Sequence, residues 1–104
     1  GSGPAYVFYF LEAMQQAGTE LGLTASQARR LAVGTFAGGT ELAADSPEPL
    51  ATLRERVTSK GGTTHAALTA LEQAGVKAAF VKAMHAACVR AAELGDEFGR
   101  TPPH

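Results

Sequence analysis

The spacing of apolar and polar positions predicts helices along nearly the whole chain. Pro4 suits the first turn of a helix, where its missing N–H is not needed, with Ser2 or Gly3 as the cap. We expect this helix to run to about Leu21 and to end near Gly22, because glycine tolerates a left-handed backbone. Its opening, residues 5–11, is apolar on every side rather than along one stripe. Such a helix must be covered on more than one side.

A second helix is predicted to begin at Thr24, because Gln27 follows three residues later and completes a capping box. Gly34, Gly38 and Gly39 lie inside this helix, where each costs roughly 1 kcal/mol relative to alanine. We expect a neighbouring element to approach the backbone closely at these glycines. The expected inward face consists of small and apolar residues at helical spacing: Ala28, Leu31, Ala32, Thr35, Phe36, Gly39, Leu42 and Ala43.

Residues 46–49, Ser-Pro-Glu-Pro, predict a stop and a new start, with Ser46 as cap and Pro47 in the first turn of a short helix. Apolar positions at helical spacing then predict one short helix before a polar break at residues 58–64 and two helices after it. These positions are Leu50, Leu53 and Val57 for the short helix, Ala67, Leu68 and Leu71 for a fourth helix ending at Gly75, and Phe80, Met84, Ala87 or Cys88, Ala91, Leu94 and Phe98 for the last. No stretch alternates as a strand does. The fold class is therefore predicted to be all-α, a bundle of about five helices in one domain over residues 1–104.

The composition argues against several classes of function. Of 104 residues, 45% are apolar and 18% charged, which is typical of a globular domain. The formal net charge is −1 with no basic block, so nucleic-acid binding is not expected. The longest apolar stretch, residues 5–11, is too short to span a bilayer and no signal peptide is seen, so no membrane association is expected. A single cysteine, Cys88, excludes an internal disulfide and suits a reducing, cytoplasmic setting.

Most other titratable side chains have a structural interpretation. Cys88 lies on an apolar stripe and is expected in the core. His65 and His85 are expected on the surface, and the three histidines lack metal-ligand spacing, so no metal is expected. Arg29 is expected on a solvated helix face. Glu12 is unusual on an apolar helix, and we expect it to point outward.

Residues 58–64, Thr-Ser-Lys-Gly-Gly-Thr-Thr, are the most informative segment. Gly61 and Gly62 let the backbone turn with positive φ and point successive N–H groups the same way. The following helix adds its own unpaired N–H groups and the positive end of its dipole. Together these groups predict a site for a carboxylate or a phosphate.

Three hydroxyl groups in the same segment can donate to an anion or to a ring nitrogen, namely those of Ser59, Thr63 and Thr64. The alternative is an ordinary turn between helices in which Thr63 only caps the next helix. Local features by themselves leave both interpretations open.

A longer stretch around this segment resembles the signature of the pyrroline-5-carboxylate reductases. Residues 53–68 read Leu-Arg-Glu-Arg-Val-Thr-Ser-Lys-Gly-Gly-Thr-Thr-His-Ala-Ala-Leu, and Leu71-Glu72 follows. The family usually has Leu-Arg-Asp-x-Val-x-Ser-Pro-Gly-Gly-Thr-Thr and then an alanine-rich helix ending in Leu-Glu. Residues 1–8 with Glu12-Ala13, and residues 90–95, resemble the beginning and the closing helix of its C-terminal domain. The resemblance thus covers almost the whole chain.

Lys60 stands where the family usually has proline. Lysine keeps its N–H and lacks the φ constraint of proline, so the loop is expected to be less rigid. Its ammonium group can also assist anion binding, so the departure is not expected to inactivate the site.

The resemblance implies that this chain is the C-terminal dimerisation domain of an enzyme that reduces 1-pyrroline-5-carboxylate to L-proline with NADPH or NADH. It implies an intertwined homodimer, and higher rings of dimers, with the fold of the 6-phosphogluconate dehydrogenase C-terminal domain. The family's Rossmann domain is expected to be missing, since the chain has no Gly-x-Gly-x-x-Gly run. The chain by itself is therefore expected to bind no cofactor and to be inactive.

The same resemblance assigns the site residues. Backbone N–H groups of Gly61, Gly62 and Thr63, with the Ser59 hydroxyl, would hold the substrate carboxylate. Thr64 would be the catalytic residue, with its hydroxyl near the imine nitrogen. The alternative is a non-catalytic helical dimerisation module that keeps the scaffold for association only. A Rossmann fingerprint upstream of Gly1 would discriminate between the two.

Overall fold

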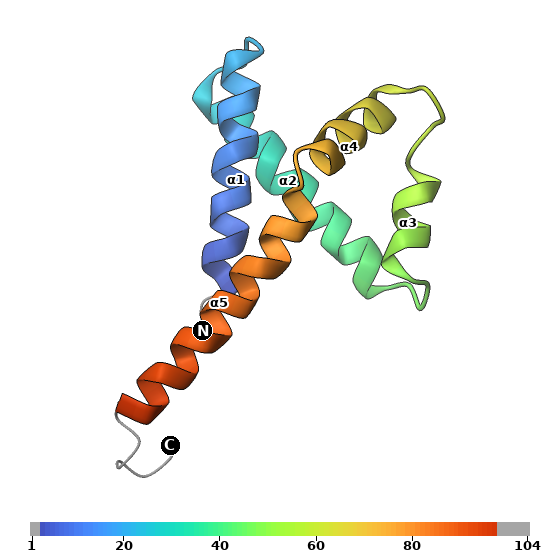
Figure 1. The fold of residues 1–104 in the computed structure, drawn as a ribbon. Helices are drawn as coiled ribbons and strands as arrows, with labels where there is room; N and C mark the ends of the chain where they lie inside the picture. The colour runs from blue at the N-terminus through green and yellow to red at the C-terminus, as the bar shows by residue number, and fades with distance from the viewer. Residues whose placement is uncertain (1–2, 98–104) are drawn as a thin grey trace. The chain divides into compact units, whose positions relative to one another are not determined.

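The computed structural model describes residues 3–97, and these form five helices with no strand (Figure 1). The helices are α1 Gly3–Glu20, α2 Ala25–Ala44, α3 Leu50–Arg56, α4 Thr63–Gln73 and α5 Val76–Glu97. This confirms the predicted all-α class and the number of helices. The chain divides into two compact units, Gly1–Arg54 and Glu55–His104. None of the described helices is long and apolar enough to cross a bilayer.

The first helix of the first unit ends as its sequence predicts. Gly22 has φ +110°. The N–H groups of Leu23 and Gly22 donate to the carbonyls of Gly18 and Thr19, at 3.0 and 3.1 Å. This pattern is a Schellman motif, in which a glycine in the left-handed region reverses the chain. At the other end Gly3 lies inside α1 rather than capping it, and Ser2 falls outside the described residues.

The predicted capping box at the start of α2 is confirmed. The Gln27 N–H donates to the Thr24 hydroxyl oxygen at 3.1 Å, and the Thr24 N–H donates to Gln27 Oε1 at 3.0 Å. Both groups at this helix start are thus satisfied by the chain's own side chains. The chain reversal at Gly22 and this capping box together determine the residue at which α2 begins, next to the end of α1.

Close packing of α1 on α2 depends on one glycine. A Cβ added to Gly18 would lie 2.8 Å from the Cβ of Ala28, so the backbones approach as closely as methyl groups permit. Ala28 and Ala32, one turn apart, are each 1% exposed and are the only fully buried apolar residues among those described. The predicted approach at the α2 glycines is not found in this chain, because a Cβ at any of them would meet nothing within 4 Å.

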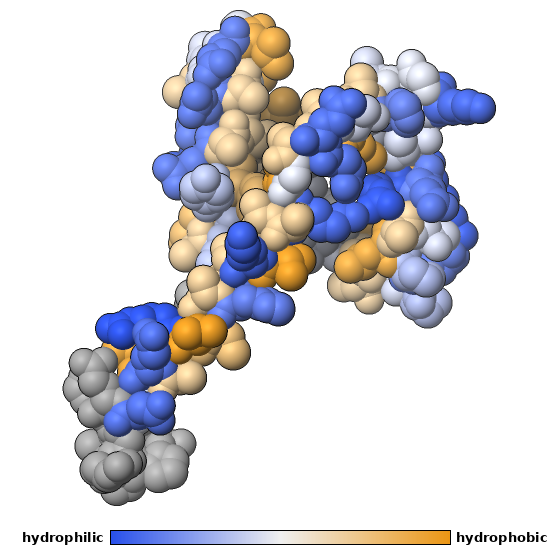
Figure 2. Space-filling view, viewed as in Figure 1, coloured by the Kyte–Doolittle hydropathy of each residue, from blue (hydrophilic) through white to orange (hydrophobic). Residues whose placement is uncertain are grey.

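The outer sides of this helical pair leave large apolar side chains in solvent. Leu31 and Leu42, predicted to face inward, are 57% and 69% exposed, so that part of the prediction is wrong for a single copy. Phe8 and Tyr9 on α1 are also exposed. Figure 2 shows apolar residues at the surface of α1. Residues 5–11, which are apolar on all sides, are therefore covered on only part of their surface in a single copy.

The start of α3 differs from prediction. Ser46 does not cap a helix; its Oγ accepts from the Glu48 N–H at 3.2 Å in a local turn. The helix begins only at Leu50, and the Pro49 carbonyl accepts from the N–H groups of Thr52 and Leu53. The reason is the second proline: a residue before proline is disfavoured in the helical region, so Glu48 cannot continue a helix begun at Pro47.

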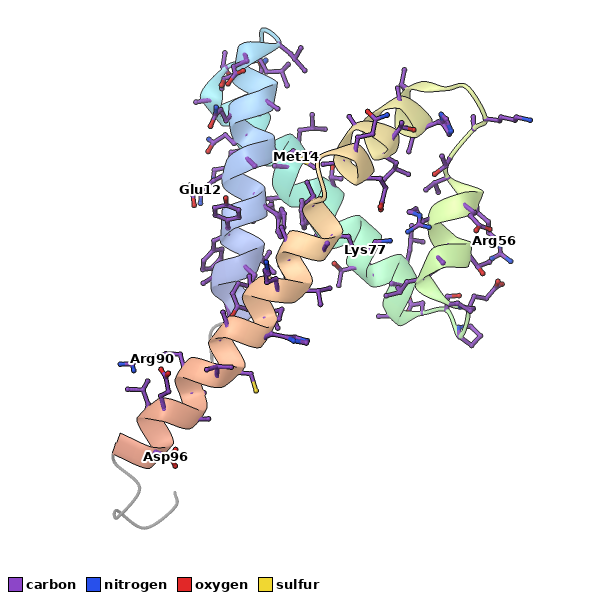
Figure 3. All side chains as sticks on the ribbon, viewed as in Figure 1. Glu12, Met14, Arg56, Lys77, Arg90 and Asp96 are labelled. Carbon is purple, nitrogen blue, oxygen red and sulfur yellow. The ribbon has the colours of Figure 1, made fainter. Side chains whose placement is uncertain are left out.

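In the second unit, α4 and α5 are joined at Gly75, which has φ +71°. Lys77 (Figure 3) forms an exposed ion pair with Glu72 at 3.3 Å. Such a pair adds at most about 1 kcal/mol to the free energy of unfolding. Because α4 has 11 residues and α5 has 22, α4 cannot cover the far half of α5. Cys88 is consequently exposed and not in the core, contrary to prediction. Phe98 of the predicted stripe lies outside the described residues.

The contact at Gly18 generates a stability prediction. Gly18→Val should lower the free energy of unfolding by about 1–3 kcal/mol, because the new side chain overpacks against a methyl group fixed to the α2 backbone. Gly95→Val is the control, since a Cβ there meets nothing within 4 Å. Its effect should stay within about 0.5 kcal/mol. Chemical denaturation followed by circular dichroism measures both, and equal effects would contradict the close contact.

Candidate anion-binding turn at the start of α4

A tight turn of four residues leads into α4 (Figure 1). The Gly62 N–H donates to the Ser59 carbonyl at 3.0 Å, which closes the turn. Gly61 has φ +75°, and no non-glycine residue among those described has positive φ, so Lys60 does not. Negative φ at the second position and positive φ at the third define a type II turn. Proline is common at the second position of such turns, which is the position of Lys60.

The two glycines are favoured for different reasons. Gly61 supplies the left-handed conformation of the type II turn. Gly62 has extended backbone angles, φ −88° and ψ −176°, that any residue can adopt. A Cβ on Gly62, however, would lie 3.2 Å from the Ser59 Cβ and 3.3 Å from the Ser59 carbonyl oxygen. Gly61 is therefore favoured by its conformation, whereas Gly62 avoids a tight contact with Ser59.

The N-terminus of α4 has no side-chain cap. Gly62 is the N-cap residue and has no side chain to accept a hydrogen bond. Ala66 is the first residue whose N–H bonds back, to the Gly62 carbonyl at 3.1 Å. The N–H groups of Thr63, Thr64 and His65 are left without intrahelical acceptors. The alternative in which Thr63 caps the helix is thus wrong, because Thr63 is the first helical residue.

This open start differs from that of α2, where a side chain already accepts the Gln27 N–H. At α4 the unpaired N–H groups and the positive end of the helix dipole remain available to an external anion. Ser59, Thr63 and Thr64 are all exposed here, so their hydroxyls are accessible as well.

The charge of the segment also favours an anion. Residues 54–65 contain three basic residues and one acidic residue, a formal charge of +2, in a chain whose net charge is −1. Lys60 and His65 are exposed, and the Lys60 ammonium has no hydrogen-bond or ion-pair partner among the described residues. Its charge is therefore free to act on a bound carboxylate.

The four residues of the turn, Thr63 and Thr64 are consecutive, and all are exposed except the half-buried Gly62. The Gly62 N–H, predicted to face the anion, instead donates to the Ser59 carbonyl. Sequence reasoning missed the N–H of His65 as a further donor. A glycine at the N-cap was the signal, because it leaves the donors of the whole first turn unpaired. Within residues 3–97 there is no cluster of three or more metal-ligating side chains.

The chain matches the family described as "Pyrroline-5-carboxylate reductase dimerisation" over residues 1–94. It is 43% identical to the pyrroline-5-carboxylate reductase of Pseudomonas aeruginosa over 96% of this chain and 37% of that protein. It is 38% identical to pyrroline-5-carboxylate reductase 2 of Bacillus subtilis, over 94% of this chain and 35% of that protein.

Two solved structures are similar along the same length. The Plasmodium falciparum pyrroline carboxylate reductase with NADP bound has a TM-score of 0.88 at 34% identity, over 91% of this chain and 38% of that one. The Coxiella burnetii pyrroline-5-carboxylate reductase has a TM-score of 0.86 at 44% identity, over 90% of this chain and 35% of that one. The chain therefore belongs to the pyrroline-5-carboxylate reductase family, through its dimerisation domain. It spans little more than a third of the length of these relatives.

The turn type generates a second stability prediction. Lys60→Pro should raise the free energy of unfolding by about 0.4–1 kcal/mol, because proline restricts the unfolded chain and the Lys60 N–H has no partner to lose. Gly61→Ala should lower it by roughly 1–2 kcal/mol, because alanine is strained at positive φ. Thermal unfolding of the two variants measures both. A destabilised Lys60→Pro variant would contradict a type II turn.

Proposed function

We propose that this chain is the C-terminal part of an NAD(P)H-dependent oxidoreductase that reduces 1-pyrroline-5-carboxylate to L-proline in proline biosynthesis. The observation that carries the proposal is the open row of N–H groups at the start of α4, directly after the glycine turn. It falls in the segment that resembles the family signature. A module that served association only would have no need of unpaired donors there.

The substrate carboxylate would bind at this turn. The N–H groups of Gly61 and Thr63 and the hydroxyl of Ser59 are donors suited to a carboxylate, and the helix dipole adds to the attraction. Gly62 serves by its lack of a side chain, since its own N–H is used within the turn. Lys60 would strengthen binding by its charge.

Thr64 would then lie beside the imine nitrogen. It follows the carboxylate-binding residues directly on α4, and its side chain is exposed. A threonine hydroxyl is too weak an acid to protonate an imine outright, so its role would be to orient the ring and to relay a proton to that nitrogen. Fixing the ring in one orientation itself contributes to rate.

The nicotinamide cofactor would supply the reducing equivalent, as NADPH or NADH. A dinucleotide site needs a strand followed by a glycine-rich turn and a helix, and residues 3–97 contain no strand. We therefore place the cofactor site of the full-length enzyme in a Rossmann domain outside residues 1–104. The Plasmodium falciparum relative, solved with NADP bound, supports this choice of cofactor.

The enzyme would be an intertwined homodimer, and rings of such dimers would be its higher assemblies. The family description names dimerisation, and the apolar surfaces of α1 and α2 are uncovered in a single copy. Its place would be the cytoplasm, which suits a chain whose single cysteine is exposed and unpaired.

Removal of one hydroxyl tests the proposed site in the full-length enzyme. Thr64→Ala should lower kcat about 5- to 13-fold, since the loss of one hydrogen bond near the reacting nitrogen is worth about 1–1.5 kcal/mol. Thr64→Ser keeps the hydroxyl and should recover most of the activity. Thr69→Ala, at an exposed threonine farther along α4, should leave kcat unchanged. NADPH oxidation with 1-pyrroline-5-carboxylate measures all three, and normal turnover by Thr64→Ala would refute the assigned role.

A further inference from the structure

An open hollow of about 440 Å³ lies along one side of the α1–α2 pair, wholly within the first unit. Phe8 and Leu11 of α1 and Ala32 and Val33 of α2 line it with apolar atoms. Phe8 is 61% exposed and Val33 is 46% exposed, so a single copy leaves much of this lining in water. The hollow is a surface that requires cover.

Two charges of opposite sign line the same hollow, Glu12 from α1 and Arg29 from α2. Neither side chain has a hydrogen bond or an ion pair with any other described residue. Figure 3 shows Glu12 pointing away from the axis of α1. The charges expected to be ordinary solvated ones are thus placed on an apolar surface.

Covering the apolar lining would take both charges out of water. An isolated buried carboxylate is costly, and it is tolerated only with a counter-charge or several hydrogen bonds. A cover for Phe8 that also brings a cation to Glu12 and an anion to Arg29 is therefore favoured over one that brings neither. Of the candidate occupants, a second copy of the same surface meets both needs at once. Two-fold symmetry makes every contact reciprocal, so a Glu12 that meets Arg29 of the partner subunit brings the second such pair with it.

We infer that two copies of this chain place their α1–α2 hollows face to face, with Glu12 of each copy paired with Arg29 of the partner subunit. The inference rests on the proposed homodimer and adds the surface and the charge pair that set its register. The matched family segment, residues 1–94, includes the whole hollow. Opposite charges exchanged across a two-fold axis favour one alignment of the two copies and disfavour others.

Charge reversal in single variants and in their mixture tests the pairing. E12R gives a hollow with two cations, and R29E gives one with two carboxylates. Each variant should dimerise with itself about tenfold or more weakly than the parent chain, because like charges meet across the interface. An equimolar mixture should form heterodimers with a dissociation constant within about threefold of the parent value. Within each copy the two like charges remain together, so only pairing between copies can restore affinity.

A matched control uses two exposed charges of α2 outside the hollow. R30E and E41R change the net charge by the same amounts as R29E and E12R. These variants should dimerise like the parent chain, alone and mixed. Native mass spectrometry with one partner mass-tagged measures homodimers and heterodimers together, and circular dichroism confirms that every variant keeps its helices.

Three results would overturn the inference. One is self-association by E12R and R29E equal to that of the parent chain, in which case the dimer stands and this pairing fails. Another is weak self-association with no heterodimer in the mixture, which would place the pair within one copy or against another segment. The third is weakened self-association of R30E and E41R, restored in their mixture to the same extent as for E12R and R29E, which would show that net charge alone causes the effect. A parent chain that is monomeric throughout would instead refute the proposed homodimer itself.

Discussion

A helix with apolar residues on all sides needs neighbours on all sides, and α1 has a neighbour on one side only in its own unit. The contact with α2 is as close as it can be, because Gly18 allows the Ala28 methyl group to touch the α1 backbone. That closeness buries small residues and leaves the large ones outside. Phe8 and Tyr9 stay exposed on α1, and Leu31 does on α2. Burial at roughly 25 cal/mol per Å² makes their cover by a second copy the main available source of further stability.

The proposed substrate site depends on how the N–H groups at a helix start are satisfied. Where α2 begins, Thr24 and Gln27 satisfy the free N–H groups of the helix. Where α4 begins, the N-cap is Gly62, and the donors of the first turn remain free. A glycine N-cap in place of a side-chain cap costs only about a few tenths of a kcal/mol. In return it presents several oriented donors to an anion, which is what recognition of a carboxylate requires.

Local signals in the sequence predicted the elements well, because short-range chemistry determines them. The reversal at Gly22 and the capping box at Gln27 depend only on residues within one turn. The start of α3 was misjudged at Ser46, since the second proline overrules the first. Exposure could not be predicted for Leu31 or Cys88, because periodicity identifies an apolar face and not the chain that covers it. For the site, the residue types and the unpaired N–H groups of the helix start were predictable, whereas the use of the Gly62 N–H within the turn was visible only in the structure.

We infer that this chain completes its apolar surface with a second copy of itself. Light scattering coupled to size-exclusion chromatography over a range of micromolar concentrations tests that claim most directly. We expect a mass of at least twice 10.7 kDa, that is about 21 kDa or more, across the range. A stable 10.7 kDa monomer that unfolds cooperatively on denaturation would contradict it.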